Sequence, residues 1–190
     1  MSELNKGVGK VEVSLRWDPS PAGAAAHDLD LVAAVYTADA PYGPPDYLVH
    51  FDSRSPDGTI ALLRDSRTGQ GFGYDESMTV ELDRLAARYA RVVVGVAIQQ
   101  GAGRLTFGQV RATGVRVREG YTDLLVDDLA GVADATAATI AEFTRGGDGT
   151  DAAQAGAGAE TGSRWSFRAF LHGFDIDPST FGAVMGARRA

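Results

Sequence analysis

Short segments of alternating apolar and polar residues recur along the whole chain, and they limit the fold more than any other feature of the sequence. In the first of them, VEVSLRW, every second residue from Val11 to Trp17 is apolar, as in a half-buried strand. Turn-rich pieces such as APYGPPD separate these segments, and no long helices intervene. The rhythm predicts an all-β fold, a two-sheet antiparallel β-sandwich. The other predicted strands are residues 29–36, 47–51, 59–63, 78–82, 91–99, 110–118 and 164–173.

Four segments do not follow this strand pattern clearly. Residues 82–90 (LDRLAARYA) contain helix-forming residues and are predicted as a short helix, and residues 178–189, which begin with proline, as a C-terminal helix. Residues 133–145 (ADATAATIAEFTR) fit a helix by their alanines and a strand by their alternation. Residues 146–162 have almost no bulky side chains and are predicted as a flexible loop. We treat residues 1–190 as one domain.

The bulk composition excludes several classes of function. The 190 residues include 18 basic and 25 acidic ones, and the net charge of −7 repels phosphate backbones, so we expect no nucleic-acid partner. The chain has no cysteine, which removes disulfides, thiolate metal sites and thiol redox chemistry. Its first residues, MSELNKGVGK, lack the apolar segment of a signal peptide, and no run approaches the roughly 20 apolar residues of a membrane span. We expect a cytoplasmic protein without membrane insertion.

A glycine-rich segment lies between acidic residues in RDSRTGQGFGYDES, residues 64–77. Its three glycines are flanked by Asp65 on one side and by Asp75 and Glu76 on the other. A dinucleotide-binding loop would lead into a helix, and a Walker loop would add a lysine, but this segment leads into a predicted strand and has no lysine. Calcium, in contrast, needs about six to eight oxygens from carboxylates and bent backbone carbonyls in a small volume. The segment therefore favours a hard cation.

A second acidic element is HDLDL, in which Asp28 and Asp30 lie two residues apart on a predicted strand. Their carboxylates therefore point to the same face and repel each other. A divalent cation shared with the segment from Asp65 to Glu76 would neutralise them. Two other interpretations stay open, which are solvation in water and a counter-charge from a nearby arginine. The candidate arginines are Arg54, Arg64 and Arg67.

The order of these motifs resembles the TerD family of tellurium-resistance and stress-response proteins. The resemblance rests on VSLRWD, HDLDLVA, VHFDSRSPDGTI, RDSRTGQGFGYDES, VVVGVAIQQ and a late WSFRA, and it spans about residues 8–175. It implies a two-sheet β-sandwich that binds calcium through the two acidic segments, and a strand at ATAATIAEFTR, residues 135–145. Carried over by position, the implied calcium ligands are Asp28, Asp30, Asp65, Asp75 and Glu76.

The glycine-rich segment departs from the family pattern at several positions. Residues that are usually acidic or polar ligands in the family are here Ser66, Gln70, Phe72 and Tyr74. Because calcium affinity follows the number of charged ligands, we expect weaker binding than is normal for the family, with one or two ions. The two aromatic residues, Phe72 and Tyr74, would either cover the site or form a contact surface.

The resemblance implies a non-catalytic calcium-binding protein that works through other stress-response proteins, including partners at the inner face of the membrane. Two alternatives stay open, which are a metal-free scaffolding sandwich and a hydrolase that uses its paired carboxylates. The hydrolase is disfavoured because Trp17 and Trp165 are expected in the core and no G-x-S-x-G motif occurs. His27 is a lone histidine beside Asp28, and a surface position is favoured over transition-metal ligation. We therefore expect no enzyme activity.

Overall fold

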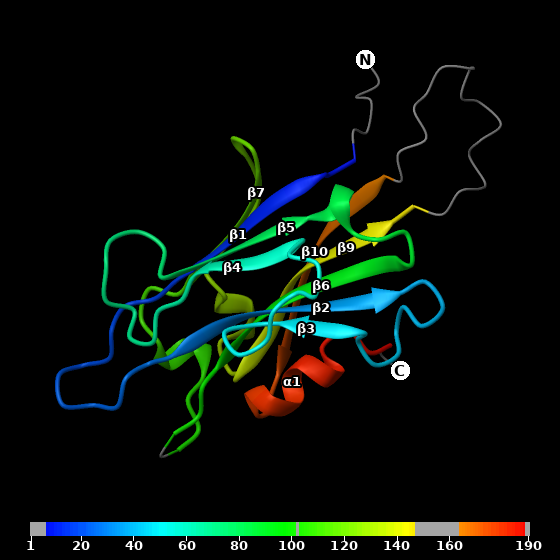
Figure 1. The fold of residues 1–190 in the computed structure, drawn as a ribbon. Helices are drawn as coiled ribbons and strands as arrows, with labels where there is room; N and C mark the ends of the chain where they lie inside the picture. Colours follow the sequence, from blue (N-terminus) through cyan, green and yellow to red (C-terminus); the bar gives the residue numbers. More distant parts are fainter. Residues whose placement is uncertain (1–6, 102, 147–163, 189–190) are drawn as a thin grey trace, which may run out of the picture.

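A computed structural model describes residues 7–101, 103–146 and 164–188, which form two antiparallel five-stranded sheets packed face to face (Figure 1). The first sheet has the strand order β4-β5-β1-β7-β8 and the second the order β10-β9-β6-β2-β3. The predicted all-β sandwich is confirmed. The strands of the first sheet are β1 (Lys10–Arg16), β4 (Ile60–Arg64), β5 (Glu76–Glu81), β7 (Gly114–Glu119) and β8 (Thr122–Asp127). Those of the second are β2 (Leu29–Thr37), β3 (Tyr47–Val49), β6 (Tyr89–Ile98), β9 (Ala137–Arg145) and β10 (Trp165–Phe174).

Helical structure among the described residues is short. The helix α1 (Pro178–Val184) has proline in its first turn, and the Asp177 side chain caps it by accepting a hydrogen bond of 2.9 Å from the Ser179 amide. It confirms the predicted C-terminal helix, which ends at Val184 rather than at residue 189. No described helix is long and apolar enough to cross a membrane. Single 3-10 turns occur at η1 (Leu82–Arg84), η2 (Phe107–Gln109) and η3 (Ala130–Val132).

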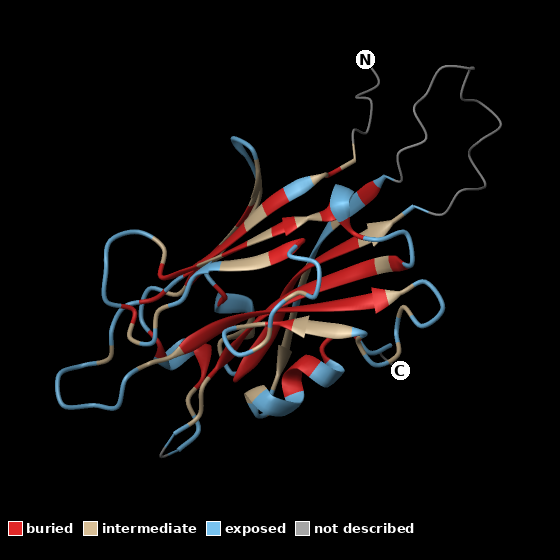
Figure 2. Ribbon diagram, in the orientation of Figure 1, coloured by how far each residue is buried: buried red, intermediate tan, exposed pale blue. Residues whose placement is uncertain are grey.

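The alternation within the strands explains the core between the two sheets. In β1 the apolar residues Val11, Val13 and Leu15 are buried, and they belong to the same apolar cluster as Leu29 and Leu31 of β2. Buried residues concentrate in the inner strands of each sheet, whereas the loops are exposed (Figure 2). The two tryptophans are also buried in this core, as expected from their place in alternating segments.

β6 is the central strand of the second sheet and is buried on both of its faces. Val92 and Val94 face the main core between the sheets, while Val93 faces outward and packs with Phe181 of α1. Because the helix covers the outer face, β6 is apolar along its whole length instead of alternating. The predicted strand at residues 91–99 is confirmed, with observed bounds of Tyr89 and Ile98.

The predicted helix at residues 82–90 is wrong. Its first residues form only the single turn η1, and β6 begins at Tyr89. This segment carries the chain from the first sheet to the second, and its bulky residues Leu82, Leu85 and Tyr89 are all buried in the core. The burial of these side chains where the chain changes sheets outweighs the helix propensity of the segment.

Two strands of the structure extend the sequence interpretation. β8, which was not predicted, pairs with β7 through a turn at Gly120, whose φ of 56° lies in the left-handed region that favours glycine. β9 settles the open segment 133–145 as a strand, as the family resemblance implied. Its alanines suit a strand that is buried on both faces, between the main core and α1. The predicted flexible loop at 146–162 lies outside the described residues from residue 147 onward.

A buried ion pair joins the second sheet to the C-terminal segment. Nε of Arg91 on β6 donates to Oε1 of Glu142 on β9 at 2.7 Å, and both side chains are almost fully buried. Nη1 of Arg91 also donates to the Gly186 carbonyl at 2.6 Å, and Nε of Arg168 donates to Oε2 of Glu142 at 2.7 Å. Burial opposes ionisation of Glu142, but the hydrogen bonds from the two arginines outweigh it and lower the pKa of Glu142. The pair therefore fastens the chain after α1 to the sheet.

Candidate metal centre

The first residues of β2 extend past their neighbouring strand on one side. Leu29 and Leu31 are fully buried in the core, and Asp30 between them points to the opposite face, as the alternation predicts. β3 pairs with β2 only from Ala33 to Val35, so the edge of β2 around Asp30 is left without a partner strand. A polar group from elsewhere in the chain must therefore satisfy the backbone there.

Glu76, the first residue of β5, supplies that group. Its Oε2 accepts a hydrogen bond of 2.7 Å from the Leu31 amide, so that a side chain of the first sheet binds the open edge of the second. Glu76 has no exposed surface, and its other carboxylate oxygen, Oε1, is buried without a hydrogen-bond partner among the described residues. A buried acceptor of this kind costs about 1–3 kcal/mol unless a ligand or a proton satisfies it.

Three of the five sequence-predicted ligands come together at Glu76. Asp30, Asp65 and Glu76 each offer a carboxylate oxygen, and these oxygens all lie within 4.8 Å of one another. Asp65 follows directly after β4 and is exposed to solvent, while Asp30 is buried and also lines a cavity of about 240 Å³ beside α1. The two acidic segments therefore converge as the sequence predicted, and solvent reaches the cluster from the side of Asp65.

The negative charge of this cluster acts on Asp28, the fourth of the predicted ligands. Its side chain is half-buried, and its Oδ1 has no hydrogen-bond partner within the described part of the chain. Burial, followed by the negative charges of Asp30 and Asp65, raises the pKa of Asp28 to about 6, and Arg67 only partly opposes the shift. Asp28 is therefore within electrostatic reach of the three carboxylates although it is not one of the group.

Asp75 has a different position from the other predicted ligands. Its Oδ2 accepts a hydrogen bond of 3.0 Å from the Trp17 amide, and its own amide donates to the Leu15 carbonyl at 2.8 Å. Asp75 is buried, and it fastens the end of the glycine-rich segment to the end of β1. Asp75 therefore holds the backbone beside Glu76 in place, and it does not belong to the group formed by Asp30, Asp65 and Glu76.

Burial, and to a smaller extent the neighbouring carboxylates, disfavours ionisation of the acids at this site. Burial, reinforced by Asp65 and Asp30, raises the pKa of Glu76 to about 10, although the Leu31 amide acts in the opposite direction. Burial also raises the pKa of Asp30, a shift that a hydrogen bond from Gln99 opposes and the charge of Asp65 increases. None of the ion pairs between described residues includes an acid of this site. No arginine or lysine of the described residues therefore forms an ion pair with these acids, although Arg67 is near enough to lower the pKa of Asp28 and of Asp30 in part.

Two features of the site were not predicted from the sequence. Gln99, just after β6, donates a hydrogen bond through Nε2 to Asp30, and its amide donates to the Asp28 carbonyl at 2.8 Å. Predicting the role of Gln99 would have required the register of β2 against β6, which sets Leu29 opposite Ile98. The second feature is the polar contacts of Trp17, a residue for which the alternation indicated only core packing.

The two aromatic residues of the glycine-rich segment do not cover the acids. Phe72 is fully exposed, at 101% of its reference surface. The ring of Tyr74 lies 4.5 Å from Cζ of Arg116 on β7, against the outer face of the first sheet. Of the two roles proposed for Phe72 and Tyr74, covering the site is therefore excluded for Phe72, and Tyr74 already has a neighbour elsewhere.

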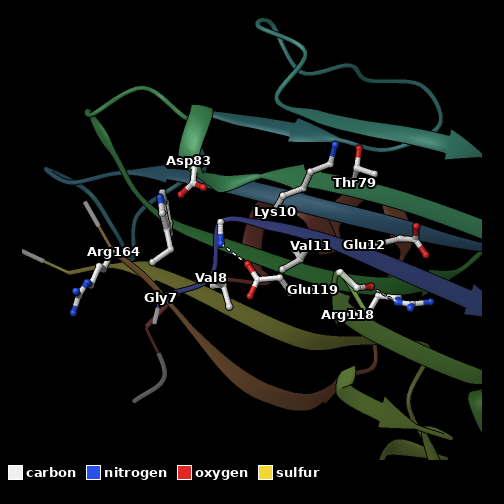
Figure 3. Close-up of a pocket in the computed structure, with 13 residues that line it drawn as sticks. Gly7, Val8, Lys10, Val11, Glu12, Thr79, Asp83, Arg118, Glu119 and Arg164 are labelled. Atoms are coloured by element: carbon white, nitrogen blue, oxygen red, sulfur yellow. Dashed lines mark hydrogen bonds between the residues drawn. The ribbon is translucent and has the colours of Figure 1, made fainter. Parts of the chain in front are cut away.

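A groove of the described structure lies away from these acids, beside the start of β1 (Figure 3). It has a volume of about 840 Å³ and is lined by charged residues of both signs, but by none of the predicted metal ligands. Several of these charged side chains already have partners within the protein. Oε1 of Glu119 accepts a hydrogen bond of 2.7 Å from the Gly9 amide, Lys10 forms an ion pair with Glu81, and Arg118 donates a hydrogen bond to the Gly120 carbonyl. The groove provides no second candidate for a cation.

Comparison with known proteins identifies the family. The sequence profile of the TerD domain matches residues 1–177. Tellurium resistance protein TerD from Alcaligenes sp is 30% identical over 119 residues, which are 62% of this chain and 62% of that protein. General stress protein 16U from Bacillus subtilis (strain 168) is 30% identical over 136 residues, which are 68% of this chain and 70% of that protein.

Comparison of the structure with solved structures identifies the same family. The crystal structure of a homologue of telluride resistance protein (TerD), SCO6318 from Streptomyces coelicolor A3(2), is similar to this chain with a TM-score of 0.86 and 52% sequence identity. The likeness covers 96% of this chain and 100% of that one. The profile match includes all ten strands, while α1 lies beyond it. The chain therefore belongs to the TerD-domain family.

Proposed function

We propose that this protein is a non-catalytic calcium-binding member of the TerD family that acts in a stress response. The observation that carries the proposal is the convergence of the carboxylates of Asp30, Asp65 and Glu76, one of which, Glu76, has a buried Oε1 without a hydrogen-bond partner among the described residues. A bound cation would satisfy this oxygen and would favour the ionised form of Glu76, which burial and the neighbouring acids disfavour. Calcium would supply positive charge and no chemistry of its own at this site.

The donor set favours calcium over other metals. All three grouped donors are carboxylates, which suit hard cations, while the cysteine thiolates that zinc and softer metals prefer do not occur in the chain. Asp30, Asp65 and Glu76 would hold the ion, and Asp28 is a further acid within electrostatic reach of Asp30 and Asp65. The described residues contain one such group, so we propose a single ion. Because Ser66, Gln70, Phe72 and Tyr74 add no charged ligand, its binding is expected to be weaker than is usual in the family.

A regulatory or scaffolding role fits this site better than catalysis. A pair of carboxylates that cleaves a glycoside needs room for a sugar beside it, whereas Asp30 and Glu76 are both buried and only Asp65 is exposed. The names of two relatives refer to tellurium resistance and general stress. Without cysteine this chain cannot reduce tellurite through thiols, so a resistance role would be indirect, through stress-response partners in the cytoplasm or at the inner face of the membrane.

Thermal unfolding in the presence of calcium or of a chelator tests the proposal. Calcium at about 100 times its dissociation constant is expected to raise the free energy of unfolding by about 2.7 kcal/mol and to raise the midpoint accordingly. Magnesium at the same concentration serves as the control, and a smaller shift is expected because magnesium gives up its water reluctantly. Equal midpoints in chelator and in millimolar calcium would favour the metal-free scaffold instead.

A further inference from the structure

Trp17, the residue after β1, makes polar contacts with both acidic segments. Its indole Nε1 donates to the His27 carbonyl at 2.9 Å, directly before Asp28. Its backbone amide donates to Oδ2 of Asp75 at 3.0 Å, directly before Glu76. Trp17 is only 3% exposed, so these contacts are shielded from water. One side chain and its backbone therefore connect the two chain segments that carry the acids.

The glycine-rich segment also packs closely against the indole. Gly69 has a φ of 65°, in the left-handed region, and a Cβ at this position would lie 2.6 Å from Nε1 of Trp17. Only glycine allows the backbone to approach the ring this closely without strain. Position 69 therefore requires glycine. The contact also shows that the middle of the glycine-rich segment lies against Trp17, in addition to its end at Asp75.

We propose that Trp17 is a positioning residue that holds the two acidic segments in register and thereby sets the affinity for the cation. The inference rests on the proposed function, because it assigns Trp17 to the same calcium site. Groups that orient metal ligands from outside typically change metal affinity by about 10–100-fold when they are removed. The indole is also a spectroscopic reporter, since a cation that tightens the two segments changes its surroundings.

The second tryptophan offers a matched control. Trp165 on β10 is also fully buried in the core, but its Nε1 has no hydrogen-bond partner among the described residues. It lines the groove of Figure 3, which includes none of the acids of the site. Trp165→Phe therefore removes the same atoms from a buried ring as Trp17→Phe does, without removing a hydrogen bond to an acidic segment.

Calorimetric titration of calcium into the wild type, Trp17→Phe and Trp165→Phe tests the inference. Trp17→Phe is expected to weaken calcium binding by about tenfold or more, and Trp165→Phe by less than about twofold. Calcium is expected to change the tryptophan fluorescence of the wild type and of Trp165→Phe, but not that of Trp17→Phe. Gly69→Ala, which keeps Trp17 but forces the segment away from the indole, is expected to weaken binding similarly and replaces Trp17→Phe if that variant does not fold.

The possible outcomes separate the two proposals. If the wild type binds calcium and the variants at Trp17 and Gly69 bind it as tightly as Trp165→Phe, the role of Trp17 is overturned and the calcium site stands. If the wild type binds no calcium, the proposed function fails and the role of Trp17 in calcium affinity fails with it. A loss of affinity in Trp17→Phe and Gly69→Ala alone supports both.

Discussion

Glu76→Gln is expected to weaken calcium binding by about 100-fold while the metal-free protein stays folded and at least as stable as the wild type. The amide oxygen of glutamine can still accept the hydrogen bond from Leu31, so the link between the two sheets is kept. The negative charge that faces Asp30 and Asp65 is lost, and removing one partner from a buried charge pair costs about 3 kcal/mol or more. Calorimetric titration with calcium measures the affinity, and denaturant unfolding in chelator measures the stability.

The same variant should reduce the pH dependence of the free energy of unfolding of the metal-free protein. Burial and the neighbouring acids raise the pKa of Glu76 from 4.5 to about 10, so the folded protein holds a proton that the unfolded chain releases above pH 4.5. The stabilisation from this proton is complete below the unfolded pKa and is lost as the pH rises toward 10. The wild type in chelator should therefore lose stability as the pH rises through this range, and Glu76→Gln should lose less.

Calcium binding to the wild type should also release protons, because a carboxylate binds the ion only after it has lost its proton. Titration at pH 7 in buffers of different ionisation enthalpy counts the released protons, and about one per ion is expected. Glu81→Gln is the control, since Glu81 lies on the same strand but pairs with Lys10 and Arg84 near the surface. An affinity for calcium that is the same in the wild type, Glu76→Gln and Glu81→Gln would contradict the role of Glu76.

Glu142→Ala is expected to lower the free energy of unfolding by about 3–5 kcal/mol without changing the affinity for calcium. The substitution leaves the guanidinium of Arg91 buried without its charge partner, and breaking a buried pair from one side has costs of this size. Arg91 would also hold the Gly186 carbonyl less firmly, so the segment after α1 should loosen first. Urea unfolding measures the stability, and hydrogen exchange of the amides in α1 measures the loosening.

Arg168→Ala is the matched control for this buried pair. Arg168 also donates to Glu142, but its side chain is 64% exposed, and an exposed ion pair contributes only about 0–1 kcal/mol. The pKa of Glu142 is lowered, so the contribution of the pair is present above the ordinary pKa of glutamate and is lost as the pH falls below it. If Glu142→Ala and Arg168→Ala destabilised the protein equally, the buried pair would not be the main anchor of the C-terminal segment.

The sequence predicted the sandwich because alternation in a strand follows directly from which face is buried. The errors lie where tertiary packing overrides local preference. Residues 82–90 have helix-forming residues, yet Leu82, Leu85 and Tyr89 are buried where the chain crosses between the sheets. β8 was missed because an edge strand with one solvated face has a weak apolar pattern, as its exposed Val126 illustrates.

The candidate site was predicted in part for a related reason. The convergence of Asp30, Asp65 and Glu76 was expected from the two acidic motifs, because a shared divalent cation would neutralise both, and the family resemblance implied the same site. The separate position of Asp75 could not be predicted, because it depends on which backbone amide lies next to its carboxylate, here that of Trp17. The hydrogen bond from Gln99 likewise requires the register between β2 and β6, which the sequence pattern does not specify.

The most direct test of the calcium site is a crystal structure of the protein grown in millimolar calcium, with anomalous diffraction data to locate the ion. We predict one anomalous peak in contact with carboxylate oxygens of Asp30, Asp65 and Glu76, at the distances of about 2.3–2.6 Å that calcium adopts. A structure from such a crystal in which these carboxylates lie apart without a peak, or in which the guanidinium of Arg67 lies between them, would contradict the account.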